Sequence, residues 1–171
     1  MTDSTRDEWS LAVLIDRGGV HYNVPGAGQT ELLTNAISLL PPIPALDPGN
    51  LLREILEREA LVSTGIGKGI ALPHPRSPIL APSGEGANRG PLVALIFPAR
   101  PLGWNTPDGS KVHTLFLIVS SSAKQHLGAL SKINFLCQQE KFYSLIEARS
   151  PKETIIAAIG EAETTWSRSV L

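Results

Sequence analysis

Apolar residues recur along this chain at two different spacings, which predict alternating helices and strands. Positions three or four residues apart predict helices over about residues 9–17, 30–40, 48–59, 123–137, 139–148 and 151–163. Alternation over 20–24 and near-continuous apolar runs at 92–97 and 112–119 predict strands. A glycine-rich stretch from residue 65 predicts a further short, buried strand that delivers His74 to its end.

Two segments rich in proline and glycine separate these elements. Residues 75–91 predict a long irregular loop, and residues 98–111 predict an exposed excursion with a tight turn at 107–109. Trp104 lies in the excursion, where it either covers a site or packs as an ordinary aromatic residue.

Helices and strands alternate through one chain of 171 residues, a length typical of a single domain. The pattern predicts the α/β fold class: a single-domain sandwich in which a mixed β-sheet is flanked by helices on both faces. We expect the domain to span residues 9–163, with a disordered or loosely ordered N-terminus at 1–8 and a C-terminal tail at 164–171.

Composition and charge exclude several classes of partner. Lys and Arg total 15 against 16 Asp and Glu, so no broad basic field is available for nucleic acid or anionic lipid. The longest apolar runs are less than half of a membrane span, so we expect no membrane insertion. Cys137 is the single cysteine and cannot form an internal disulfide, and the polar N-terminus lacks the features of a signal peptide. We therefore expect a cytoplasmic protein.

Two of the four histidines fall where a site can form. His74 follows a predicted strand, and His126 lies in the first turn of a helix that follows another strand. Both positions lie at the carboxyl ends of strands, where α/β sheets usually bind ligands. A neutral imidazole is a nucleophile at pH 7, and a second imidazole beside it can donate a hydrogen bond to an oxyanion.

Other interpretations of the histidines stay open. A histidine after a buried strand is often structural, and His113, inside an apolar run, favours a satisfied or edge-facing residue over a ligand. Two or three histidines can also bind zinc, but the sequence contains no close His-x-His, Cys-x-x-Cys or His-Glu-x-x-His pattern. We predict no metal and no cofactor.

Three segments carry a resemblance to a known family. The pair Arg58-Glu59, the run Ser63-Thr-Gly-Ile-Gly-Lys-Gly-Ile-Ala-Leu-Pro-His74 and the motif His126-Leu-Gly-Ala-Leu130 occur in order and at compatible spacing. The chain resembles the enzyme IIA domains of the fructose, mannitol and nitrogen-regulatory class of the phosphoenolpyruvate-dependent phosphotransferase system. The resemblance extends from about residue 14 to residue 163.

The resemblance implies a phosphocarrier. In that family the histidine of the Pro-His step accepts a phosphoryl group from the histidine phosphocarrier protein, which makes His74 the implied acceptor. It also implies a supporting imidazole at His126 and a cation near the phosphoryl group at Arg58, although Arg58 also fits a solvated ion pair on a polar helix face. The next partner is a IIB domain or a regulatory target protein.

One departure leaves the function open. Pro75 follows His74 where the family commonly has glycine or another small or polar residue, and proline removes an amide donor. The segment 77–90 is also longer than usual. The 171 residues contain neither a IIB nor a membrane IIC domain, which favours a stand-alone regulatory protein of the nitrogen type. A sugar-transport IIA subunit and a binding module that takes no phosphoryl group are the alternatives.

Overall fold

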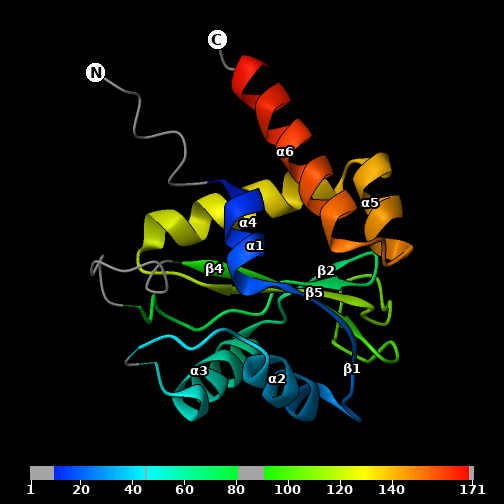
Figure 1. The fold of residues 1–171 in the computed structure, drawn as a ribbon. Helices are drawn as coiled ribbons and strands as arrows, with labels where there is room; N and C mark the ends of the chain where they lie inside the picture. Colours follow the sequence, from blue (N-terminus) through cyan, green and yellow to red (C-terminus); the bar gives the residue numbers. More distant parts are fainter. Residues whose placement is uncertain (1–9, 45, 81–90, 170–171) are drawn as a thin grey trace.

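A computed structural model describes residues 10–44, 46–80 and 91–169 and has a five-stranded sheet between two layers of helices (Figure 1). The helices are α1 (Leu11–Gly18), α2 (Gln29–Ser38), α3 (Pro48–Leu61), α4 (Ala123–Cys137), α5 (Glu140–Glu147) and α6 (Lys152–Ser169). The strands are β1 (Val20–Val24), β2 (Gly65–Gly67), β3 (Ile70–Ala71), β4 (Leu92–Pro98) and β5 (Thr114–Val119). The predicted fold class, an α/β sandwich around a mixed sheet, is confirmed.

The strand order is β1-β4-β5-β3-β2, and it mixes both kinds of pairing. The central strands β4 and β5 are antiparallel, whereas β1 is parallel to β4 and β3 is parallel to β5. Figure 1 shows α1, α4, α5 and α6 on one face of the sheet and α2 and α3 on the other. Because β3 and β5 are parallel, both strands end at the same edge of the sheet.

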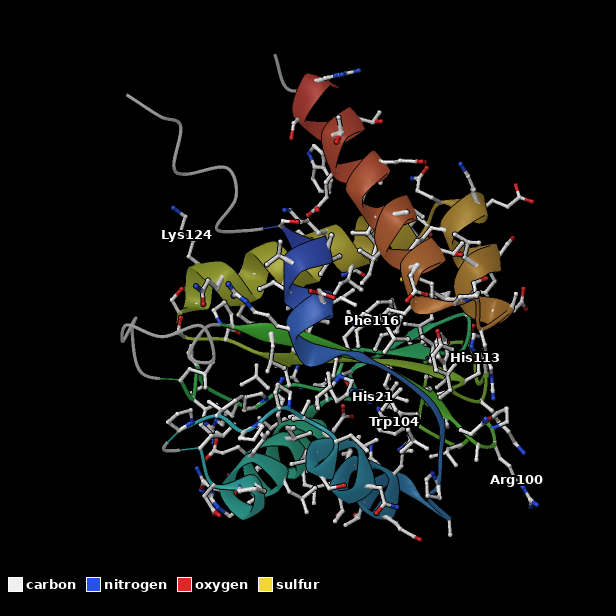
Figure 2. All side chains as sticks on the ribbon, in the orientation of Figure 1. His21, Arg100, Trp104, His113, Phe116 and Lys124 are labelled. Carbon is white, nitrogen blue, oxygen red and sulfur yellow. The ribbon has the colours of Figure 1, made fainter. Side chains whose placement is uncertain are left out.

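Each face of the sheet carries its own core, because side chains alternate along a buried strand. In β5, Phe116 and Ile118 belong to the core under α1, α4, α5 and α6, while Leu115 and Leu117 belong to the core over α2 and α3. Figure 2 shows Phe116 and Trp104 on these opposite sides. Burial on both faces explains why this strand is a continuous apolar run.

Local sequence signals set several helix ends. Asp47 caps α3 by accepting a hydrogen bond from the Asn50 amide, and Pro48 occupies the first turn, where no amide donor is needed. Ser122 caps α4 in the same way through the Gln125 amide. Because α4 begins directly after β5, this cap fixes the first turn of α4 at the end of that strand.

The strand before His74 differs from the prediction. The glycine-rich stretch forms a small antiparallel hairpin of β2 and β3, and Lys68 takes a left-handed conformation (φ 55°) at its turn. The Lys68 amide donates to Asp108, and the hydroxyl of Tyr143 donates to the Lys68 carbonyl, so contacts from two other segments stabilise the turn. The single predicted strand is therefore two strands.

The excursion at 98–111 is less exposed than predicted. Leu102 and Trp104 are buried, and Leu102 pairs with Val112 in an isolated bridge. The Ser63 hydroxyl donates to the Trp104 carbonyl and ties the segment to the start of the hairpin. The predicted turn at 107–109 is present, closed by a hydrogen bond from Gly109 N to the Thr106 carbonyl.

The last helix is longer than predicted, since α6 continues past residue 163 to Ser169, through much of the expected tail. The hydroxyls of Thr164 and Thr165 bond back to carbonyls four residues earlier, and Trp166 packs on Phe135 of α4. The expected loose N-terminus at 1–8 and part of the loop at 75–91 lie outside the described residues. In the part of the chain that the structure describes, no helix is long and apolar enough to cross a bilayer.

Candidate functional site

The two candidate histidines lie side by side at the edge where β3 and β5 end. Ile70 and Ala71 of β3 pair with Thr114 and Leu115 of β5, and the pairing continues as Ile118 N donates to the Pro73 carbonyl at 3.0 Å. This register places His74 opposite Ile118, on the face covered by α4. His126 comes from the first turn of α4, and its ring centroid lies 4.3 Å from that of His74.

The backbone fixes which nitrogen of His74 carries the proton. Nδ1 lies 2.7 Å from the carbonyl oxygen of Leu72. A carbonyl oxygen only accepts hydrogen bonds, so Nδ1 must be the donor and hold the proton. In the neutral ring Nε2 then carries the free lone pair. His74 is buried, with 7% of its surface exposed, so the residues around it hold the ring in this orientation.

Both rings are held in the neutral form near pH 7. Burial lowers the pKa of His74 below its usual value, more than the hydrogen bond to Leu72 raises it, and the charge of Arg58 lowers it further. Burial lowers the pKa of His126 to about 4, with His74 and Arg58 adding to the effect. The pair therefore combines a nucleophilic nitrogen with a neighbouring neutral imidazole.

Arg58 lies near the two rings without touching either in a hydrogen bond. It sits in the last turn of α3, and its Nη1 donates to the Val62 carbonyl at 2.7 Å. Its positive charge acts on both histidines, as their lowered pKa values record. The competing prediction for Arg58 is a solvated ion pair. On the same helix it is Arg53 that forms such pairs, with Glu54 and Glu57.

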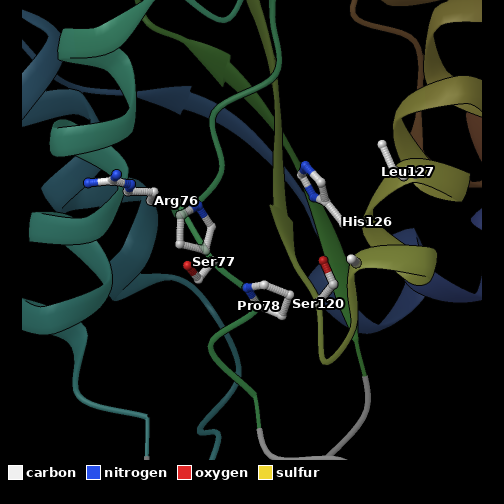
Figure 3. A pocket seen from close by; sticks show the side chains of 8 residues that line it. Arg76, Ser77, Pro78, Ser120, His126 and Leu127 are labelled. Atoms are coloured by element: carbon white, nitrogen blue, oxygen red, sulfur yellow. The ribbon is translucent and has the colours of Figure 1, made fainter.

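Beside His126 lies an open hollow of about 200 Å³. It is lined by Pro75, Arg76, Ser77, Pro78, Ser120, Ala123, His126 and Leu127. Figure 3 shows the His126 ring and the Ser120 hydroxyl bordering the hollow, with the Arg76 guanidinium turned away from His126. Leu127 is 61% exposed at its rim, which gives the entrance an apolar border.

Two residues that support the site could not be assigned from the sequence. The Glu59 carboxylate accepts hydrogen bonds from the Thr64 amide and hydroxyl, and the Thr64 carbonyl in turn accepts from Leu72 N. This series of hydrogen bonds connects α3 to Leu72, whose carbonyl orients His74. The adjacency of Arg58 and Glu59 is the signal that points to Glu59, since the charge of Arg58 acts on both histidines.

The remaining candidates have structural environments. Nδ1 of His113 is 2.8 Å from the Thr114 hydroxyl, as expected for a satisfied residue, and Cys137 is buried, which raises the pKa of its thiol to about 12. Within 10–44, 46–80 and 91–169, no group of three or more His, Cys, Asp or Glu side chains is arranged to hold a metal ion.

Comparison with known proteins identifies the family of the chain. Residues 14–162 match the family model described as the phosphoenolpyruvate-dependent sugar phosphotransferase system, EIIA 2. A nitrogen regulatory protein of Pseudomonas aeruginosa is 30% identical over 126 residues, covering 72% of this chain and 77% of that protein. The fructose-specific EIIABC component of Bacillus subtilis is 26% identical over 155 residues, which are 88% of this chain but 23% of that protein.

Solved structures give the same answer for the fold. The nitrogen regulatory protein IIA-Ntr of Neisseria meningitidis superposes with a TM-score of 0.71 at 25% identity, covering 86% of this chain and 97% of that one. The enzyme IIA for mannitol of Escherichia coli, in its complex with phosphorylated enzyme IIB, has a TM-score of 0.64 at 14% identity, covering 83% and 94%. The match over residues 14–162 shows that the chain belongs to the EIIA 2 family of the phosphoenolpyruvate-dependent sugar phosphotransferase system.

Proposed function

We propose that this protein is a phosphocarrier that accepts a phosphoryl group on Nε2 of His74. The observation that carries the proposal is the hydrogen bond from His74 Nδ1 to the Leu72 carbonyl, with the His126 ring 4.3 Å away. It presents one nucleophilic nitrogen in a fixed direction beside a second imidazole. The donor is the histidine phosphocarrier protein, as the family implies.

The transfer exchanges one nitrogen–phosphorus bond for another. Nε2 of His74 attacks the phosphorus in line, the bond to the donor's histidine breaks, and the donor ring leaves with that electron pair. The phosphorylated ring keeps its Nδ1 proton and becomes positively charged, which strengthens its hydrogen bond to Leu72. Because donor and product are both phosphohistidines, the step is nearly reversible and suits a relay.

The surrounding residues act on the charge of the phosphoryl group. Its oxygens carry negative charge that spreads during transfer, and positioned donors stabilise it. The His126 ring can donate a hydrogen bond to an oxygen. Arg58 supplies a positive charge, and its bond to the Val62 carbonyl can be exchanged for one to the phosphoryl group.

We propose a regulatory role of the nitrogen type in the cytoplasm, with a regulatory target protein as the partner. The support is the similarity to two nitrogen regulatory proteins, from P. aeruginosa and N. meningitidis. The alternative is a sugar-transport IIA that passes the group to a IIB domain. The fructose EIIABC component and the mannitol IIA in complex with phosphorylated IIB favour that alternative.

Intact-mass measurement tests the proposal. The protein is incubated with phosphoenolpyruvate, enzyme I and the histidine phosphocarrier protein, and wild type is compared with His74→Ala. We expect one acid-labile, base-stable phosphoryl group on wild type and none on His74→Ala. A phosphoryl group that persists in His74→Ala, or its absence from wild type with a competent donor, contradicts the proposal. The second result leaves the binding module that takes no phosphoryl group.

A further inference from the structure

The three consecutive serines between β5 and α4 differ in what their hydroxyls do. Ser121 donates to the side-chain oxygen of Gln125 at 2.6 Å, and Ser122 caps α4 by accepting from Gln125 N at 3.2 Å. The Ser120 side chain is buried, with 4% of its surface exposed, and its hydroxyl has no hydrogen-bond partner among the described residues. This hydroxyl borders the hollow beside His126, where it is free to donate a hydrogen bond to a bound group.

The register of the sheet places Ser120 on the same face as His74. His74 lies opposite Ile118, because Ile118 N bonds to the Pro73 carbonyl in the continued pairing of β3 with β5. Side chains two residues apart in extended backbone lie on one face of the sheet. Ser120 is two residues after Ile118, so its side chain lies on the same face as those of Ile118 and His74. Ser120 and His126 also line the same hollow (Figure 3).

Ser77 also lines this hollow and carries a hydroxyl, but it is exposed to solvent. Pro75 has no N–H at the position directly after His74, and the Arg76 guanidinium is turned away from His126 (Figure 3). Among the residues that line the hollow, Ser120 and His126 are the ones at least partly buried that can donate a hydrogen bond to an anion carried by His74. Both are neutral groups that can donate a hydrogen bond.

We propose that Ser120 is a phosphoryl-binding residue, whose hydroxyl donates a hydrogen bond to the phosphoryl group carried by His74. This inference rests on the proposed function. A hydrogen bond to a charged acceptor is stronger than one between neutral groups, so it stabilises the charge that develops during transfer.

The test uses phosphoramidate as a small phosphoryl donor, so that docking of a protein partner plays no part. Nε2 of His74 attacks its phosphorus, the nitrogen–phosphorus bond of the reagent breaks, and ammonia leaves. The rate of phosphorylation is followed by intact mass in wild type, Ser120→Ala and Ser121→Ala. Ser121→Ala is the matched control, because it removes a hydroxyl one residue away that is already bonded to Gln125.

We expect Ser120→Ala to slow phosphorylation by about tenfold or more, and Ser121→Ala by less than about twofold. The phosphorylated Ser120→Ala protein should also lose its phosphoryl group faster than wild type. Ser120→Cys keeps a side chain of similar volume, but its thiol is a poor hydrogen-bond donor, so it should behave like Ser120→Ala. This second variant covers the case in which alanine disturbs the fold.

The outcomes separate this inference from the proposed function. Equal rates for Ser120→Ala, Ser120→Cys and Ser121→Ala, in a wild type that is phosphorylated on His74, overturn the role of Ser120 alone. A wild type that takes no phosphoryl group from phosphoramidate or from the histidine phosphocarrier protein, or a His74→Ala variant that takes one as readily, overturns the proposed function and this inference together.

Discussion

Nδ1 of His74 donates to the carbonyl oxygen of Leu72 at 2.7 Å, and this one bond decides the chemistry of the ring. The proton stays on Nδ1, so only Nε2 is free to bond to phosphorus. We expect the neutral Nδ1–H tautomer in the free protein and phosphorus on Nε2 in the product. Long-range ¹H–¹⁵N NMR of the imidazole distinguishes the two tautomers and the two phosphohistidine isomers. Phosphorus on Nδ1 would refute this assignment.

His126 should affect the rate of transfer without being needed for the fold. His126→Asn removes the imidazole beside the phosphoryl group but keeps a polar side chain in the first turn of α4. We expect phosphorylation of His74 to slow by about tenfold, the effect of losing one hydrogen bond to a charged group. Circular dichroism should stay unchanged, and transfer at the wild-type rate would show that His126 plays no part.

Arg58 should act through its charge. Arg58→Gln removes the positive charge that lowers the pKa of both histidines, so both values should rise in an NMR titration of the imidazole protons. Phosphoryl transfer should slow as well, because a cation near the phosphoryl oxygens is lost. Arg53→Gln is the control, since Arg53 is engaged with Glu54 and Glu57 on the same helix. Equal pKa values in both variants would contradict a site role for Arg58.

The neutral histidine pair should make the protein sensitive to mild acid. The pKa of His126 is lowered to about 4 and that of His74 is also lowered, whereas in the unfolded chain both return to their ordinary value. Between about pH 6.5 and pH 4 the unfolded chain binds more protons than the folded one, so the free energy of unfolding falls as the pH falls. The Tm should decline over this range, and less steeply in His126→Asn. Parallel Tm profiles would show that His126 is not responsible.

A carboxylate on the last helix should stabilise the first helix. Glu163 accepts hydrogen bonds from Leu11 N at 2.6 Å and from the Ser10 hydroxyl and Lys132 Nζ, each at 2.9 Å. Negative charge is favourable at a helix N-terminus, so Glu163→Gln should lower the free energy of unfolding by about 1–2 kcal/mol. Urea denaturation measures the loss. Glu161→Gln is the control, because Glu161 is largely exposed and should change little.

The sequence was informative about the histidines because their positions follow from local patterns. His74 follows one apolar strand and His126 lies in the first turn of the helix that follows another, and strand ends are where α/β sheets bind ligands. The neighbour relation of β3 and β5 could not be predicted in this way. Parallel strands are joined by long connections, and their order depends on packing between distant segments. The bond from His74 to Leu72 likewise depends on the backbone path after β3.

The differences between prediction and structure have tertiary causes. Lys68 takes the left-handed conformation because Asp108 and Tyr143 hold the turn, and neither is near it in sequence. Trp104 is buried although prolines and glycines surround it, because burying an aromatic side chain outweighs the loop character of its neighbours. Beyond residue 163, α6 continues where Trp166 packs on Phe135.

The pairing of β3 with β5 also governs when the site exists during folding. It joins a strand that begins at Ile70 to one that begins at Thr114, and β3 has only two residues of its own. Contacts between segments so far apart form late, since the entropy of closing the intervening chain opposes them. Until this part of the sheet closes, the two imidazoles are separate side chains with ordinary proton affinity. Under the proposed function, competence to accept a phosphoryl group then reports completed folding, so a nascent or misfolded copy takes none.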